Sequence, residues 1–267
     1  MQITSQEGES HVEVLNYFFV DRWENGDREM NYTSLMFKPH LVLKMIRGDK
    51  TITRRPLKEQ PDGVDVVRRT GSDGVWTGYK NGAQEDGQPL FMGKRPKYEI
   101  GDIIRVREPW STDVMFDHMK PSEILDVARE KVPIWYGADN ELYWYYRGAM
   151  HKDSEDIGSV MQLIDPVRGK KRSSMFMPNW AARLLLKIVD LDIERVLDIT
   201  EEDAMAEGAE PDPNEWQENG VYKSSCTYRL GFLALWNQIN RERGMSVDVN
   251  PLVWRIVFET LYSSEFF

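Results

Sequence analysis

The pattern of apolar and polar positions predicts a short helix and a strand that meet near residue 50. Apolar residues recur at helical spacing between Leu41 and Ile46, and Gly48 stands where such a helix is expected to end. The next residues, Lys50-Thr51-Ile52-Thr53-Arg54-Arg55, alternate as a strand entering a sheet does. A helix end, a glycine and a β-branched strand favour the edge of a polar pocket.

The same periodicities predict the other regular elements of the chain. Strands are expected at 31–37, 101–108, 134–136 and 252–258, one long strand or two consecutive strands at 183–196, and helices at 121–130, 200–208 and 226–243. The glycine-rich stretch 56–96 is typical of hairpins and loops. Strands separated by helices, without repeated βαβ units, predict an α+β fold built as a small mixed β-barrel decorated with helices.

Length and composition indicate a globular protein. The chain has 267 residues, is 41% hydrophobic and contains nine tryptophans, so it can bury a core, and we favour one elaborated domain. A lone cysteine, Cys226, fits a reducing cytosol. There is no apolar run long enough to span a membrane and no signal-peptide pattern, so we expect a cytoplasmic protein without a membrane partner. Residues 1–30 are expected to be an N-terminal extension, or the first 29 residues to precede a true start at Met30.

Charge is unevenly distributed along the chain. The formal net charge of -10 opposes loose binding along a nucleic acid backbone. Two groups are nevertheless basic: Lys44, Arg47, Lys50, Arg54, Arg55 and Lys58, and then Lys94, Arg95, Lys97, Arg105 and Arg107. A small basic pocket on an acidic body suits a nucleoside or a short nucleic acid element, whereas a solvated basic face needs no ligand. Both interpretations stay open.

Aromatic residues gather at Tyr143-Trp144-Tyr145-Tyr146, beside Arg147. Aromatic rings interleaved with a cation can stack on bases. More often, such residues pack a hairpin or a core. The sequence leaves these two readings open.

Lysine, threonine and glutamate are the candidate catalytic residue types. The four histidines are scattered and only one cysteine is present, which argues against a metal site, and no Walker loop, dinucleotide fingerprint or serine-hydrolase motif occurs. No cofactor is expected. A threonine hydroxyl attacks a carbonyl only with a neighbouring base, and a lysine of lowered pKa can be that base. On an ideal strand Lys50 and Thr53 face opposite sides, so a bend or bulge is needed to join them.

Four stretches resemble the ASCH family: Gly48–Arg55, Gly101–Val106, Leu197–Gly208 and Val253–Phe258. The longer layout, with Met177-Pro178-Asn179-Trp180 and Asn250-Pro251-Leu252-Val253-Trp254, is similar to ASCH proteins carried by phages and prophages. The resemblance implies a PUA-like β-barrel over 31–267, with insertions at about 57–97 and 112–176, and an association with RNA.

Within this superfamily, small bacterial N4-acetylcytidine amidohydrolases carry a Gly-x-Lys-x-x-Thr-x-Arg motif and a downstream glutamate. The motif falls here on Gly48, Lys50, Thr53 and Arg55, and the glutamate on Glu207. The resemblance therefore implies a metal-free hydrolase of N4-acylated cytosine nucleosides with Lys50, Thr53 and Glu207 as catalytic residues. The substrate-binding set is completed by four arginines, namely Arg54, Arg55, Arg105 and Arg107, together with Gly48.

The alternative is a non-catalytic PUA-like module, such as a phage accessory protein, that binds an RNA or DNA element through the basic groups and the aromatic residues. Its binding is expected to weaken steeply with salt and to tolerate Glu207→Ala. A hydrolase is instead expected to turn over a free nucleoside with little dependence on salt. The partner is accordingly either a modified cytosine nucleoside or a short RNA.

Overall fold

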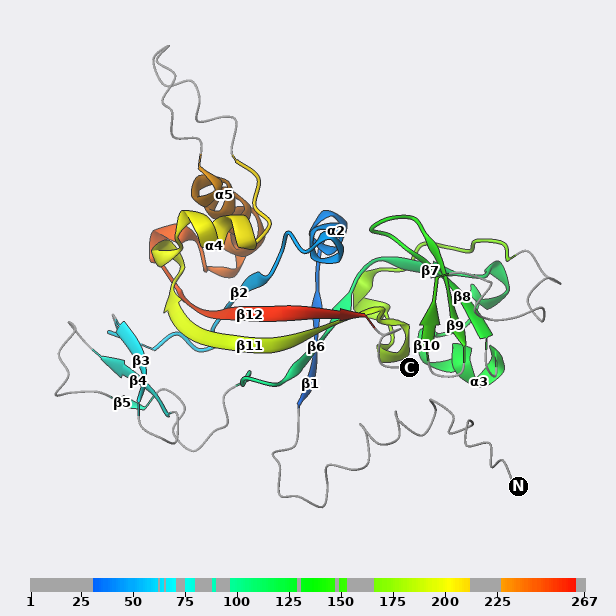
Figure 1. Ribbon diagram of the computed structural model, residues 1–267, viewed down its shortest axis with the longest axis horizontal. Helices are drawn as coiled ribbons and strands as arrows, with labels where there is room; N and C mark the ends of the chain where they lie inside the picture. Colours follow the sequence, from blue (N-terminus) through cyan, green and yellow to red (C-terminus); the bar gives the residue numbers. More distant parts are fainter. Residues whose placement is uncertain are drawn as a thin grey trace, which may run out of the picture. The chain divides into compact units, whose positions relative to one another are not determined.

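The computed structural model describes residues 31–61, 63–64, 66–70, 75–79, 88–89, 97–128, 131–146, 149–152, 166–211 and 227–262 (Figure 1). The proposed extension 1–30 and parts of both insertions lie outside these residues. The described chain is a mixed α+β protein that divides into two compact units. Unit 1 comprises 1–43, 103–186 and 261–267, and unit 2 comprises 44–102 and 187–260.

Unit 1 contains a parallel strand pair and an antiparallel sheet. β1 (Tyr32–Met36) runs parallel to β6 (Ile103–Arg107), with Ser34 opposite Arg105. The sheet has the order β10-β9-β8-β7 and is drawn in green in Figure 1. Its strands are β7 (Trp110–Thr112), β8 (Lys131–Tyr136), β9 (Leu142–Tyr146) and β10 (Ala149–His151).

The core of unit 1 lies against one face of this sheet. Trp110, Ile134 and Tyr136 are fully buried, and α3 (Ile124–Ala128) adds Ile124 to the same cluster. Short 3-10 turns complete the unit: η2 (Val114–Phe116), η3 (Pro121–Glu123), η6 (Ser174–Phe176) and η7 (Asn179–Ala181). The expected helix at 121–130 is therefore a 3-10 turn followed by one short α-helix.

Unit 2 is built around strands in the order β11-β12-β2, of which β12 and β2 are antiparallel. These are β11 (Leu184–Arg195), whose first three residues belong to unit 1, β12 (Leu252–Tyr262) and β2 (Ile52–Pro56). A second sheet has the order β3-β4-β5, from β3 (Val66–Thr70), β4 (Val75–Tyr79) and β5 (Gln88–Pro89). Its antiparallel pairs confirm the hairpins expected at 56–96.

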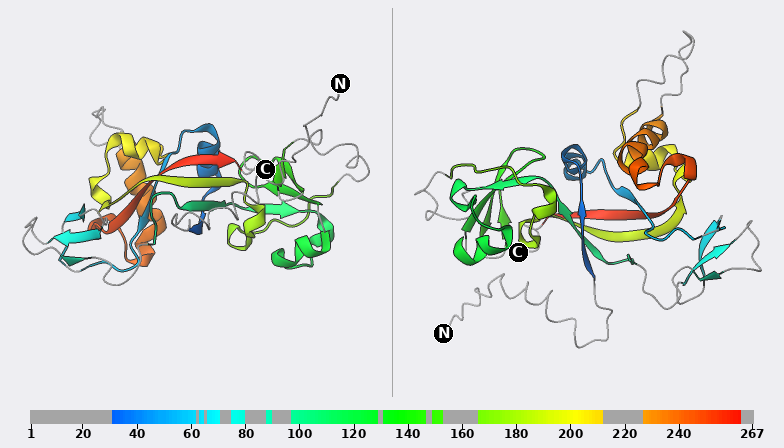
Figure 2. Two further views of the ribbon diagram at one scale, coloured as in Figure 1. Left: turned by 60° about the horizontal axis from the view of Figure 1, so that its bottom comes forward. Right: turned by 180° about the vertical axis from the view of Figure 1, so that it is seen from behind.

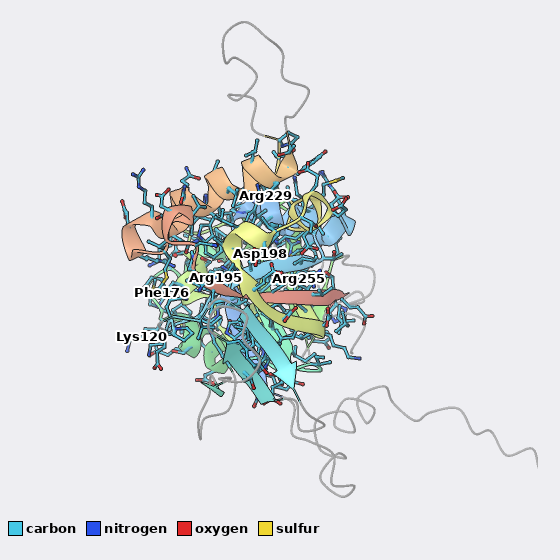
Figure 3. The ribbon with its side chains drawn as sticks, turned by 90° about the vertical axis from the view of Figure 1, so that its left-hand side faces the viewer. Lys120, Phe176, Arg195, Asp198, Arg229 and Arg255 are labelled. Carbon is cyan, nitrogen blue, oxygen red and sulfur yellow. The ribbon has the colours of Figure 1, made fainter. Side chains whose placement is uncertain are left out.

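Helices α4 (Glu201–Ala206) and α5 (Tyr228–Asn240) pack together in unit 2, as both views of Figure 2 show. Their cluster contains Ala204, Phe232 and Trp236. Three further 3-10 turns belong to this unit: η8 (Val196–Asp198), η10 (Arg241–Arg243) and η11 (Val247–Val249). At the first of these, the Arg195 amide donates to Asp198 as the chain passes from β11 towards α4 (Figure 3).

Several sequence predictions are confirmed. The helix before residue 48 is α2 (Pro39–Arg47), the stretch 183–196 is one long strand, and Thr200 is the N-cap of α4. The α+β class is also confirmed. The sheets formed by the described residues are open, and no closed barrel occurs among them. No helix in the described ranges combines the length and apolarity required to cross a lipid bilayer.

Candidate active site

The end of α2 delivers the chain into β2. Gly48 has φ +82°, a left-handed conformation that glycine adopts without a Cβ penalty. The amides of Asp49 and Lys50 both donate to the Lys44 carbonyl, at 2.8 and 3.2 Å. From Ile52 onward the chain pairs with β12, so the glycine turn fixes where Lys50 enters the sheet.

Lys50 is the centre of the site. Its side chain is 1% exposed. The Nζ atom donates to Glu207 Oε2 at 2.8 Å, to the Glu207 carbonyl at 2.7 Å and to the Ile52 carbonyl at 2.6 Å. The three N–H bonds of an ammonium group are thus all used. The contact of Lys50 Nζ with Glu207 Oε2 joins two of the residues predicted to be catalytic, which lie 157 positions apart in the chain.

Glu207 is the C-cap of α4 and is 7% exposed. A carboxylate at the C-terminal end of a helix is disfavoured by the helix dipole. Two cations compensate: Lys50 contacts Oε2, and Arg54 Nη1 lies 3.5 Å from Oε1. The Thr51 amide also donates to the Ala206 carbonyl at 2.9 Å, which ties the start of β2 to the end of this helix.

Arg54 lies in a network of carboxylates. Its Nε donates to Glu194 Oε1 at 2.6 Å, and Nη2 contacts Asp203 Oδ2. Arg255 lies directly opposite Arg54 in the register of β2 and β12, an arrangement that two like charges disfavour. Asp203 offsets the repulsion between the two arginines, because its carboxylate also accepts hydrogen bonds from Arg255 Nε at 2.6 Å and Nη2 at 2.9 Å. Arg54 is therefore engaged by protein carboxylates rather than available to a phosphate.

Burial and neighbouring charges shift the protonation equilibria of this cluster. Burial lowers the pKa of Lys50 and the charges of Arg55 and Arg54 act in the same direction, while Glu207 opposes them. Hydrogen bonds from Arg255 and Arg54 lower the pKa of Asp203 to about 2, against its partial burial. The pKa of Lys50 thus moves in the direction that a general base requires.

Thr53 lies on β2 opposite Ile256 and is 3% exposed. Strand alternation directs its side chain away from Arg54 and to the same side as Arg55. Because all the Lys50 N–H bonds have other acceptors, no hydrogen bond joins this amine to the Thr53 hydroxyl among the described residues. The structure joins Lys50, Arg54 and Glu207, and it leaves Thr53 as a neighbour on the same strand.

Arg55 has a lowered pKa, mainly because of burial, and the charge of Arg243 adds to this effect. Electrostatic interactions with Tyr98 and, to a smaller extent, with Glu207 act in the opposite direction and raise the pKa of Arg55. Gly48 contributes only backbone, two residues before Lys50. These residues belong to unit 2, as do Lys50, Thr53 and Glu207.

The other two arginines of the predicted binding set, Arg105 and Arg107, belong to unit 1 on β6. The Arg105 guanidinium lies 4.4 Å from the centre of the Tyr32 ring, and burial lowers its pKa. Arg107 donates to Asn179 Oδ1 at 3.2 Å and to the Met175 carbonyl at 3.4 Å.

Sequence reasoning missed three members of the network. The periodicity places Asp203 in the expected helix 200–208 and Glu194 and Arg255 in the expected strands, without assigning them a role in the site. The available signal is a charged residue at a partly buried position of each strand, because a charge taken out of water needs a partner of opposite sign. Which partners meet depends on the register, which the local sequence does not specify.

Comparison with protein-family models, curated proteins and solved structures finds no match to this chain. Among the described residues, no three His, Cys, Asp or Glu side chains gather in a group able to hold a metal ion. The chemistry of the cluster therefore has to be argued from its own geometry.

Proposed function

We propose that the protein is an amidohydrolase that removes the acyl group from N4-acylated cytosine nucleosides, on a PUA-like fold of the ASCH type. The observation that carries the proposal is the 2.8 Å contact between Lys50 Nζ and Glu207 Oε2. It brings the amine of the Gly-x-Lys-x-x-Thr-x-Arg motif together with the distant carboxylate that the resemblance selects.

Each residue has a defined role in this proposal. The Thr53 hydroxyl attacks the acyl carbonyl and Lys50 accepts its proton. Backbone amides near Gly48 or Arg55 stabilise the oxyanion. Glu207 protonates the departing cytosine amino nitrogen, and the C–N bond breaks to leave an acyl ester on Thr53. Because Lys50 donates to other acceptors in the resting state, substrate binding has to turn its amine towards Thr53.

The proton count of the pair is consistent with this sequence. An ammonium beside a carboxylate holds the same single proton as a neutral amine beside a carboxylic acid, and proton transfer across the 2.8 Å contact interconverts the two forms. The neutral form starts the reaction, and acylation leaves the charged form. In the second step, water gives a proton to Glu207 and attacks the ester, and Lys50 returns its proton to Thr53.

Two arginines support the reacting groups. Arg54 holds Oε1 of Glu207, which leaves the contact with Lys50 to Oε2. Arg55 lies on the side of β2 that carries Thr53, where a cation attracts an electron-rich acyl oxygen. Burial of this cluster strengthens such interactions, since they act in a medium of low dielectric constant.

The test is to incubate the protein with N4-acetylcytidine and to measure the cytidine released, and then to repeat this with other N4-acyl groups. Thr53→Val, which is nearly isosteric, Lys50→Ala and Glu207→Gln are each expected to lower kcat/KM by about 10³-fold or more. Matched exposed controls, Thr51→Val, Lys58→Ala and Glu202→Gln, are expected to keep the parent rate. Release of cytidine by Thr53→Val at the parent rate would contradict the assignment.

The second candidate is a non-catalytic nucleic-acid-binding module. It is favoured by Arg105 and Arg107, which are two residues apart on β6 and therefore lie on one side of it. The described hydrogen bonds of Arg107 go to a carbonyl and to a side-chain amide oxygen. Such a module loses affinity for RNA steeply as salt rises and binds equally well after Glu207→Gln. Absence of turnover together with this behaviour selects the second candidate.

A further inference from the structure

The antiparallel sheet of unit 1 packs the core cluster of that unit against one of its faces. Alternate residues of its strands, Val132, Ile134, Tyr143, Tyr145 and Met150, contribute to the core or pack against it. The residues between them point to the opposite side, because successive side chains of a strand alternate. The aromatic run 143–146 is thus divided between two faces.

This second side, here called the aromatic face, is defined by the strand register. It consists of Ser111 on β7, Lys131, Pro133 and Trp135 on β8, Leu142, Trp144 and Tyr146 on β9, and His151 on β10. Trp135, Trp144 and Tyr146 are each partly exposed, unlike the fully buried Trp110 and Tyr136 of the core. Three large rings on two adjacent strands therefore keep contact with solvent.

Cations accompany these rings. Lys131 Nζ lies 5.2 Å from the centre of the Tyr146 ring, and the His151 ring lies 6.4 Å from it. Arg168 reaches the other end of the face, where its Nε donates to Ser111 Oγ at 3.3 Å and its Nη1 contacts Asn140 Oδ1. No ion pair engages Lys131 or Arg168 within the described ranges.

The paired positions that define the aromatic face include no carboxylate. Described acidic groups beside it include Glu141, which precedes β9 and lies 4.0 Å from Lys152, and Asp113, which follows β7 and forms a backbone bridge with Arg168. Rings flanked by cations are complementary to a chain that alternates bases with phosphates.

We propose that the aromatic face binds single-stranded RNA, with bases stacked on Trp144 and Tyr146 and phosphates beside Lys131 and Arg168. A single strand is specified because stacking on a protein ring requires an unpaired base. The choice of RNA over DNA rests on the proposed function, which acts on a cytidine. The face itself is independent of Lys50 and Glu207, which belong to unit 2.

The experiment measures the fluorescence anisotropy of a labelled, unmodified pyrimidine RNA of about 12 nucleotides, a length within the usual site sizes. Trp144→Ala and Tyr146→Ala are each expected to weaken binding at least about fivefold, since one stacked base contributes roughly 1–3 kcal/mol. Trp144→Phe retains a stacking ring and is expected to stay close to the parent, which guards against loss of folding as the cause. Lys131→Ala is expected to weaken binding and to reduce its salt dependence.

Two matched controls lie elsewhere in unit 1 and are labelled in Figure 3. Phe176→Ala removes an aromatic ring that is 61% exposed on η6, and Lys120→Ala removes an exposed lysine before η3. Both are expected to bind RNA as the parent does. Far-UV circular dichroism and thermal unfolding verify that each variant is folded.

Four outcomes would overturn the proposal: no binding by the parent, equal loss in the controls, equal affinity for duplex RNA, or equal affinity for the corresponding DNA strand. In the first two cases the rings serve only as cross-strand packing. The RNA probe carries no acyl group, so its binding is measured separately from the release of cytidine from N4-acetylcytidine. Binding of the RNA without release of cytidine contradicts the hydrolase proposal alone. Release of cytidine without binding of the RNA contradicts the present proposal alone.

Discussion

Asp203 accepts hydrogen bonds from two arginines that the register of β2 and β12 places directly opposite each other. Its carboxylate is the counter-ion of both arginines, because Arg54 and Arg255 would repel each other without it. Lys50 and Glu207 form the adjoining pair. At the residue scale, the candidate site is therefore a set of buried and half-buried charges that need one another, and removing one leaves an uncompensated partner.

Asp203→Asn is expected to destabilise the protein by ~2 kcal/mol at pH 7, since hydrogen bonds to charged groups are lost. The folded pKa of about 2 lies below the usual 3.8, so the stabilisation is complete above about pH 5 and disappears as pH falls towards 2. Urea unfolding of the parent and the variant between about pH 5 and pH 2 measures whether their free energies of unfolding converge.

Asp190→Asn is the matched control, because Asp190 is largely exposed and lies 3.4 Å from Arg255. Its effect is expected to stay within about 0.5 kcal/mol, as for other exposed ion pairs. A difference between parent and Asp203→Asn that stays constant down to pH 2 would show that the ionised carboxylate is not the source of the stabilisation.

The elements that present the site end at glycines. Gly48 follows α2 with φ +82° and Gly208 follows α4 with φ +76°, so each helix stops where the chain has to turn towards Lys50 or away from Glu207. Thr200 accepts from the Asp203 amide at 3.1 Å and fixes the start of α4. The caps thereby set the positions of both members of the Lys50–Glu207 pair.

Gly48→Ala is expected to cost ~1 kcal/mol of stability, because a non-glycine residue is strained at this positive φ. Apart from the two chain neighbours, no atom of the described residues lies within 4 Å of the added Cβ, so the effect is one of the backbone alone. Chemical unfolding provides the value. Gly48→Asn is the companion variant, since asparagine tolerates this conformation better, and a cost equal to that of alanine would argue against left-handed strain as the cause.

At the scale of the whole molecule, each unit has its own buried ion pair. In unit 1, Arg183 Nε and Nη2 donate to the two oxygens of Glu108 at 2.9 and 3.2 Å, and Nη1 donates to Asp139 at 2.6 Å. The guanidinium also lies 4.1 Å from the centre of the Tyr136 ring. This network connects the end of β6, the β8–β9 turn and the residue before β11.

Arg183→Met is expected to cost about 3–5 kcal/mol, because Glu108 is left buried without a counter-ion. Burial already raises the pKa of Glu108 while Arg183 opposes that rise, so the variant binds a proton more readily. The double variant Arg183→Met with Glu108→Gln is expected to recover part of the loss. Thermal and urea unfolding measure both, and no recovery would mean that packing rather than charge dominates.

The amino-acid sequence by itself determined what depends on neighbours in the chain. Periodicity and turn chemistry, which act over a few residues, predict the helix ending at Gly48, the alternation of β2, the cap at Thr200 and the strands 184–195 and 252–258. The sequence therefore also placed Lys50 and Glu207 at the ends of defined elements.

Only the tertiary structure decided which of these charged groups meet. The contact of Lys50 with Glu207, and the bridge from Arg54 through Asp203 to Arg255, depend on strand register and on helix placement across 52–157 positions of the chain. A shift of one residue in that register would move every side chain to the other face without changing any local pattern. Local sequence preferences do not encode such pairings, because their free energy arises only once the distant segments are packed together.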